Sequence, residues 1–271
     1  MIDDALHHAR APAPLRAKAL AGAALVAHSL GDYERMRRSA EASLELFRRL
    51  GDERRTALAL NQLGIALSNL GDIDGGIVCH EENAAISRRL GDGIRLSAAL
   101  NNLGYCLLRQ GRRDRATALF EEGLAVCRRI GHRTGESVML GNLGLSALLV
   151  RRPAEALRFF RLAILIDREL DYAEGLIYGI VGIAAALSAG AAAPDAAMLL
   201  GAAHAAARAT AVELEPLEVE IEAEATERLR AALGAEQLAQ ADAAGEALSL
   251  DEAVERALRA AGSQKTVTDQ A

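Results

Sequence analysis

The stretch Leu100-Asn101-Asn102-Leu103-Gly104 decides the fold, because related stretches precede and follow it at one fixed interval. The earlier one is Leu60-Asn61-Gln62-Leu63-Gly64 and the later one is Leu140-Gly141-Asn142-Leu143-Gly144, which defines a 40-residue step. Triplets of the Leu-Gly-Asp type keep the same step, beginning at positions 50, 90, 130 and 170. A fixed period of roughly 20–50 residues indicates a stacked repeat array. The sequence therefore predicts a solenoid whose core lies between neighbouring repeats.

Each 40-residue unit is expected to hold two helices. The predicted repeats cover residues 13–50, 53–90, 93–130 and 133–170, with a divergent fifth at 173–208. Gly31, Gly71 and Gly111 are expected to end first helices, because glycine readily adopts the left-handed conformation of a helix C-terminus. Pro153 and Pro194 lie where second helices should begin. Arginine pairs such as Arg48-Arg49 end the second helices, where they favour the helix dipole rather than indicating a binding site.

The predicted domains are the array at residues 1–209, a helical cap at 210–261 and a disordered tail at 262–271. In the cap, an apolar stripe from Leu217 to Leu233 predicts a helix closed by Gly234, with a solvated face of glutamates. Ser249 and Glu252 form a capping-box pattern for a last helix. Residues 2–9 are expected to form a short helix whose partner helix is absent, so that the chain would be a fragment of a longer protein.

Composition excludes several classes of function. The net charge of −6 disfavours direct binding of nucleic acid and favours a protein or peptide partner. Cys79, Cys106 and Cys127 lack metal-ligand or disulfide spacing, so we expect reduced core thiols, no metal and no cofactor. The acidic N-terminus lacks the basic region of a signal peptide, which predicts a cytoplasmic protein. Residues 176–193 carry no charge, but their glycines and alanines and their phase in the repeat predict a buried helix rather than a membrane span.

The pattern of Leu-Gly on one helix and Ala and Phe on the next resembles the tetratricopeptide repeat. One unit shows it as Leu103, Gly104, Ala116 and Phe120, and the next as Leu143, Gly144, Ala156, Phe160 and Ala163. The resemblance implies an all-α, right-handed superhelical solenoid of helix pairs with a C-terminal helical cap. The 40-residue unit is similar to that of the kinesin light chains. Departures are Gly76 and His80 at the Ala and Phe positions, and Ala23 and Ala24 in place of Leu-Gly.

A second resemblance covers nearly the whole chain. The stretches Ala196-Ala197-Met198-Leu199-Leu200-Gly201 and Gly245-Glu246-Ala247-Leu248-Ser249-Leu250 follow the repeats. This order is similar to the C-terminal sensor region of bacterial transcriptional regulators of the LuxR and AfsR type, which also contain an ATPase switch. Neither Lys18 nor Lys265 follows a glycine-rich phosphate loop, so we do not expect this chain to bind ATP in that manner.

First helices of such repeats line the concave face, where amide side chains recur. An amide both donates and accepts, so a row of amides could hold the backbone of an extended peptide. The predicted peptide-binding residues are Asn61, Gln62, Asn69, Asn101, Asn102, Tyr105, Arg109 and Asn142. The structural alternative is that some of these amides bond the neighbouring helix; the groove interpretation is preferred for Asn102 and Asn142, whose joint replacement by Ala would then weaken binding and leave stability unchanged.

The six histidines are scattered, and Cys79 and His80 are adjacent, so their side chains diverge on a helix. We therefore do not expect an enzyme. The first functional hypothesis is a binding scaffold for a protein or peptide, as the sensor part of a regulator. The alternative is an assembly module that self-associates through its N-terminal end.

Overall fold

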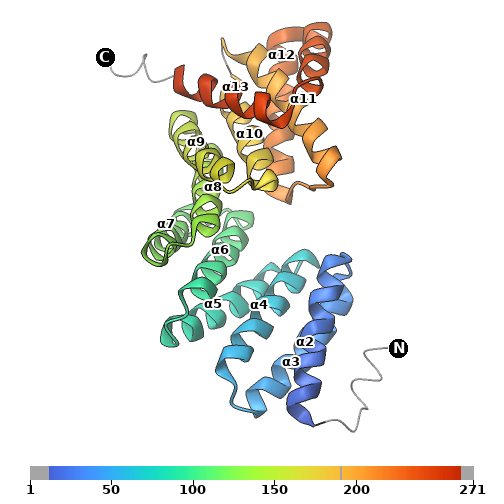
Figure 1. Cartoon of the computed structure of the whole chain (residues 1–271), viewed down its shortest axis with the longest axis vertical. Coiled ribbons are helices and arrows are strands. Elements are labelled where there is room, and N and C mark those ends of the chain that lie inside the picture. Colours follow the sequence, from blue (N-terminus) through green and yellow to red (C-terminus); the bar gives the residue numbers. More distant parts are fainter. Residues whose placement is uncertain (1–11, 190, 264–271) are drawn as a thin grey trace. The chain divides into compact units, whose positions relative to one another are not determined.

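A computed structural model describes residues 12–189 and 191–263, and in these ranges every regular element is an α-helix (Figure 1). The chain forms two compact units, Met1–His132 and Arg133–Ala271. The first unit contains α2 (Ala13–Ser29), α3 (Tyr33–Arg49), α4 (Glu53–Asn69), α5 (Ile73–Arg89), α6 (Gly93–Arg109) and α7 (Arg113–Ile130). The second contains α8 (Arg133–Leu149), α9 (Pro153–Glu169), α10 (Ala173–Leu187), α11 (Ala193–Thr210), α12 (Pro216–Glu246) and α13 (Leu250–Ser263).

The helix pairs confirm the predicted period. Their first helices begin at Ala13, Glu53, Gly93, Arg133 and Ala173, which keeps the 40-residue step. The division into units, however, lies between His132 and Arg133, inside the stretch predicted as a single array. The predicted cap at 210–261 belongs to the second unit, where α12 packs against α11 and α13 packs against α9, α10 and α11. The short helix predicted at residues 2–9 lies outside the described residues.

Glycine and aspartate form the joints between helices. The six glycines that follow helices α2 to α7 have φ between 65° and 94°, a conformation that costs other residues energy: Gly31, Gly51, Gly71, Gly91, Gly111 and Gly131. Before helices α3 to α6 an aspartate follows the glycine and caps the next helix, as Asp72 does when its side chain accepts the backbone N–H of Gly75 at 2.9 Å. Before α7 and α8 the residue after the glycine is Arg112 or His132. The same two residues thus end one helix and start the next, which accounts for the regular step in the sequence.

Small residues on first helices receive large rings from second helices. A Cβ atom added to Gly104 would lie 2.8 Å from Cζ of Phe120, and one added to Gly144 would lie 2.8 Å from Cζ of Phe160. Both rings are buried. The Leu-Gly and Phe positions of the repeat therefore determine how closely each helix pair packs.

Replacing Gly104 with Ala is expected to lower the free energy of unfolding by about 1–3 kcal/mol, because the fully buried Phe120 ring cannot move aside without strain. Gly22 on α2 is the matched control, since a Cβ there meets nothing within 4 Å. Gly22→Ala should stabilise the chain by up to about 1 kcal/mol through helix propensity. Urea denaturation of both variants measures the difference, and equal shifts would contradict the packing argument.

Helix α10 is buried on nearly all sides, which explains why it carries no charged residue after Glu174 in its first turn. It packs against α8, α9, α11, α12 and α13. Eleven of its fifteen residues are buried, so no polar face is required. Within the described residues, no helix combines the length and the apolar character needed to cross a bilayer.

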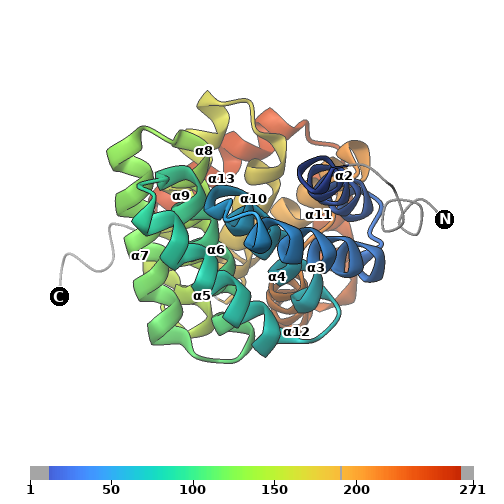
Figure 2. The same ribbon diagram turned by 90° about the horizontal axis from the view of Figure 1, so that it is seen from below.

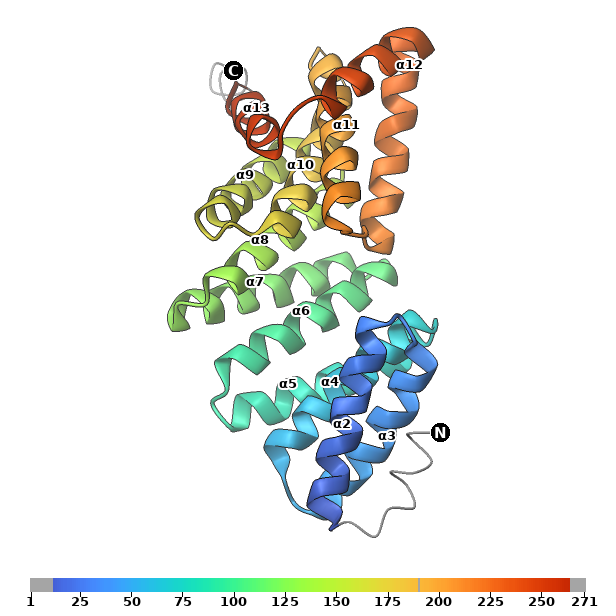
Figure 3. The same cartoon turned by 45° about the vertical axis from the view of Figure 1, so that its right-hand side comes forward.

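The end of the chain departs from the prediction in two places. Gly234, with φ 77° and ψ 168°, closes the first arm of α12 as predicted, but a second helical arm that was not predicted follows it directly and reaches Glu246 (Figure 3). The last helix extends to Ser263, so residues 262 and 263, predicted as part of a tail, are helical; residues 264–271 lie outside the described ranges. The capping box is confirmed. The backbone N–H of Ser249 donates to Oε2 of Glu252 at 2.8 Å, and the N–H of Glu252 donates to Oγ of Ser249 at 3.3 Å.

The arginine pairs at the ends of the second helices do more than favour the helix dipole. Arg48 on α3 lies 2.6 Å from Glu82 on α5, and Arg88 on α5 lies 2.6 Å from Glu122 on α7. Both partners of the second ion pair lie one 40-residue step after those of the first. These exposed ion pairs connect successive second helices and were not predicted.

Candidate protein-binding surface

The candidate surface belongs to the first unit and follows its first helices. Helices α2 and α4 pack against each other, as do α4 and α6, whereas the second helices α3, α5 and α7 approach one another less closely. Figure 2 shows these helices, in blue to green, following one another in sequence order. The first helices therefore lie on the inner side of this unit. We call the solvent-facing side chains of α2, α4 and α6 the inner face.

Three of the predicted peptide-binding amides lie together in a hydrogen-bonded chain. Nδ2 of Asn101 donates to Oδ1 of Asn102 at 3.1 Å, and Nδ2 of Asn102 donates to Oδ1 of Asn61 at 3.0 Å. The chain continues to the second helix α5, where Nδ2 of Asn83 lies 3.5 Å from the same oxygen of Asn61. Ser87 then donates to Asn83 at 3.1 Å. These amides connect α4, α5 and α6.

Two further predicted residues also bond the preceding first helix. Gln62 is buried, and its Nε2 donates to the backbone carbonyl of Ala21 on α2 at 3.0 Å. Arg109 donates to the backbone carbonyl of Ser68 on α4 at 3.0 Å. Gln62 and Asn102 are one 40-residue step apart, and each reaches one first helix back. Gln62 and Asn102 therefore form the kind of contact that the structural alternative describes, a hydrogen bond to the neighbouring first helix.

The remaining predicted residues are Asn69, Tyr105 and Asn142. Asn69 is exposed and donates to the carbonyl of Ile65 in its own helix at 2.9 Å. Tyr105 is half-buried on α6. Asn142 is half-buried on α8, which belongs to the second unit.

Apolar side chains on the inner face were missed by the sequence analysis. Leu15 and Leu25 on α2 are 59% and 60% exposed. Leu25, Ile65 and Tyr105 occupy the same place in three successive repeats, and the last two are half-buried. The 40-residue step alone would have revealed this row.

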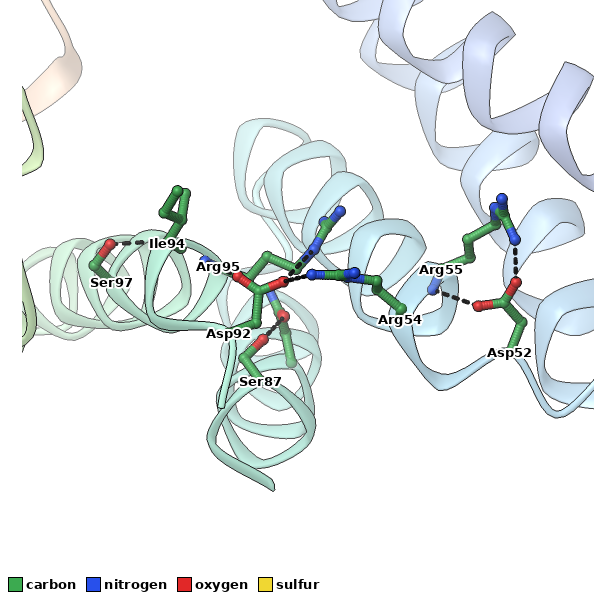
Figure 4. A network of polar contacts seen from close by, with 9 residues as sticks. Asp52, Arg54, Arg55, Ser87, Asp92, Ile94, Arg95 and Ser97 are labelled. Carbon is green, nitrogen blue, oxygen red and sulfur yellow. Dashed lines mark hydrogen bonds and ion pairs between the residues drawn. The ribbon is translucent and has the colours of Figure 1, made fainter. Parts of the chain in front are cut away.

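Charged residues gather where α4 and α6 begin (Figure 4). Asp92 caps α6 and accepts from Arg54 of α4 at 3.2 Å and from Arg95 at 3.2 Å. Asp52 caps α4 and pairs with Arg55. Burial opposes the ionisation of both carboxylates, but the N–H group of the capped helix and the neighbouring guanidinium groups outweigh burial and lower the pKa of each. Ionised Asp92 thus pairs with Arg54 and Arg95, and ionised Asp52 pairs with Arg55.

Cys79 and His80, which are adjacent on α5, are both buried and are held in their uncharged forms. Burial raises the pKa of the Cys79 thiol to about 11 and lowers the pKa of His80 to about 4. A thiol in this state is a poor nucleophile. Among the described residues, no three His, Cys, Asp or Glu side chains gather in a way that could hold a metal ion.

Comparison with known proteins identifies the repeat. The family model described as tetratricopeptide repeat matches residues 55–129 and 95–169. No curated protein matches the chain in sequence.

Solved structures share the fold at low sequence identity. TPR-like repeats assigned to a kinesin light chain of Podosopora anserina are 16% identical, with a TM-score of 0.58 over 75% of this chain and 100% of that one. BtubC of P. vanneervenii is 19% identical, with a TM-score of 0.58 over 86% of this chain and 92% of that one. A signal transduction ATPase with a tetratricopeptide repeat sensor, from Pyrococcus horikoshii, is 15% identical, with a TM-score of 0.60 over 92% of this chain but 39% of that one.

Proposed function

Residues 55–169 are tetratricopeptide repeats, and from this premise we propose that the chain is a non-catalytic scaffold that binds a protein or peptide on the inner face of its first unit. The observation that carries the proposal is the row of Leu25, Ile65 and Tyr105 on three successive first helices. A row of partly exposed apolar side chains on adjacent helices is typical of an interaction surface. The domain scheme of an array followed by a helical cap remains part of this proposal.

The role that we propose for the scaffold is the sensor or interaction region of a cytoplasmic bacterial transcriptional regulator. The similar fold of an ATPase with a tetratricopeptide repeat sensor supports this role. So does the resemblance of the stretches after the repeats to regulators of the LuxR and AfsR type. The scaffold would act on a protein partner, with no direct contact to nucleic acid or membrane.

The amides have a narrower role in this proposal than the sequence indicated. Asn61, Asn101 and Asn102 position the first helices through the hydrogen bonds that they form with one another. Asn142 is proposed as a separate contact on the second unit. Tyr105 and Arg109 are proposed as direct contacts on α6.

The test is affinity capture with the full chain as bait. Wild type, Tyr105→Ala and a control variant of an exposed residue on a second helix, Arg38→Ala, are immobilised in parallel, and captured proteins are identified by mass spectrometry. We expect a partner that the wild type and the Arg38→Ala variant retain and that the Tyr105→Ala variant loses at least tenfold. Equal recovery on all three baits would contradict an inner-face scaffold.

Self-association is the second candidate function, and one observation favours it. Val26 on α2 is 55% exposed, whereas Ala66 and Cys106, at the same place in the next two repeats, are buried. A second copy could cover this side of α2. Light scattering after size-exclusion chromatography decides: a dimer that Val26→Asp dissociates would establish self-association, and a monomer at every concentration would exclude it.

A further inference from the structure

The three first helices of the first unit are basic, although the chain as a whole is acidic. Together α2, α4 and α6 contain six Lys and Arg residues and one acidic residue, Glu53. Glu53 pairs with Arg89 of the second helix α5 at 2.6 Å. The net charge of the whole chain is −6. Positive charge is therefore concentrated on the helices that carry the inner face.

Two of these cations form no ion pair with a carboxylate in the described part of the chain. Arg109 donates to the backbone carbonyl of Ser68, which leaves most of its guanidinium donors unused. Lys18 is exposed on α2, seven residues before Leu25. The ammonium of Lys18 also helps to lower the pKa of the Asp52 carboxyl on α4, although no ion pair joins the two in the described residues. Exposed Lys18 and the unused donors of Arg109 can thus meet carboxylates of a partner beside the apolar row.

The hydrogen bonds of the inner face favour a helical partner over an extended one. An extended peptide needs donors and acceptors for its own backbone, but Asn61, Asn102 and Gln62 already bond neighbouring helices. A helix satisfies its own backbone and presents only side chains. Adjacent helices pack about 8–10 Å apart, and residues seven apart on a helix are separated by about 10 Å along its axis. The spacing of Leu25, Ile65 and Tyr105 across three helices therefore matches the spacing of apolar residues that recur every seven positions on a partner helix.

We infer that the inner face of the first unit binds an acidic amphipathic helix of a partner protein. Apolar side chains of that helix contact Leu25, Ile65 and Tyr105, and its carboxylates pair with Lys18 and Arg109. This inference rests on the proposed function and specifies the chemistry of the partner.

The experiment uses the full chain and three fluorescein-labelled synthetic helices. The first has leucine on one face and glutamate elsewhere, the second has lysine in place of every glutamate, and the third has serine in place of every leucine. Fluorescence anisotropy is expected to show that the glutamate–leucine helix binds at least tenfold more tightly than either of the others. Because the whole chain is negatively charged, non-specific attraction would favour the lysine helix instead.

Charge reversal locates the site. Lys18→Glu with Arg109→Glu should weaken binding of the glutamate–leucine helix at least tenfold and should favour the lysine helix. Each single reversal, Lys18→Glu or Arg109→Glu, should weaken binding more than Arg38→Glu, a single reversal at an exposed residue of the second helix α3, which should change binding less than threefold. Circular dichroism and melting temperature verify that the variants are folded.

Equal affinity for the acidic and basic helices would overturn the inference, and so would an equal effect of the Arg38→Glu variant. If Tyr105→Ala still loses its captured partner in that case, the proposed function stands and only the partner's chemistry is wrong. If Tyr105→Ala also leaves capture unaffected, both the proposed inner-face scaffold and the inferred helical partner are wrong.

Discussion

Relative to an Asp167→Ser variant, the wild-type chain is expected to lose about 3 kcal/mol of unfolding free energy as the pH rises from 4 to 8. Asp167 lies on α9 with 1% of its surface exposed, and its Oδ1 atom has no hydrogen-bond partner within the described residues. Burial raises the pKa of Asp167 from 3.8 to about 6, although a hydrogen bond from Ser137 opposes the rise. The 40-residue step places Phe47, Ser87 and Cys127 at the same position, so serine is a replacement that the fold already uses.

The direction of this pH dependence follows from the number of protons bound by the native and unfolded chains. Between pH 3.8 and about 6 the native carboxyl keeps a proton that the unfolded chain has released, so stability falls as the pH rises through this range. Above about pH 6, Asp167 of the native chain is ionised although it is buried. The difference between the unfolding free energies of variant and wild type, measured by urea denaturation, should therefore increase from pH 4 to pH 8. Asp251→Ser, at an exposed aspartate of the same unit, is the control; a parallel pH dependence of the two variants would refute the role of burial.

Replacing His80 with Phe is expected to give a pH dependence of the opposite direction and of similar size. His80 is 1% exposed, and its Cε1 atom would lie 2.6 Å from a Cβ added to Gly64, the same contact that Phe120 makes with Gly104. Burial lowers the pKa of His80 from 6.5 to about 4. As the pH falls from 6.5 to 4, the unfolded chain binds a proton that the native state excludes, so the wild type should lose about 3 kcal/mol of stability that the variant retains.

At pH 7 the His80→Phe variant should already be more stable by about 1–3 kcal/mol, because Nδ1 of His80 is buried without a hydrogen-bond partner among the described residues. Thermal and urea unfolding at pH 4.5, 5.5 and 7 measure both effects. His28→Phe, at an exposed position on α2, is the control. A variant that is less stable than wild type at every pH would show that the imidazole has a partner that outweighs its burial.

The sequence predicted the helices well because each one is delimited locally. A left-handed glycine such as Gly91 and a capping aspartate such as Asp92 need only their immediate neighbours, so a period in the sequence becomes a period in the structure. Gly234 shows where prediction from local sequence fails. The glycine predicts that the first arm of α12 ends there, but not that a second arm follows and packs, like the first, against α11, because those contacts join residues far apart in the sequence.

The candidate site was less predictable because its contacts join residues about one repeat apart in the chain. The 40-residue step makes Asn61 equivalent to Asn101 and Gln62 equivalent to Asn102. Whether such amides bond each other or a ligand depends on the distance between neighbouring first helices. The row of Leu25, Ile65 and Tyr105 and the buried Asp167 were both visible in the 40-residue register. Both are properties of one repeat position and not of one recurring residue type, so a pattern of identical residues does not reveal them.

The joints between helices also bear on how such a chain can change its length. Because Asp52 and Asp92 cap equivalent helices, removal of residues 53–92 would join Asp52 directly to Gly93 and keep a capped joint. Arg48 would then face Glu122 in place of Glu82, since the acidic partners recur with the same step. Gain or loss of one whole module thus preserves both the joint and the ion pair beside it. Duplication of one complete module is the mutation that this architecture tolerates best, whereas a shift by half a module would exchange first and second helices and place charged outer surfaces in the core.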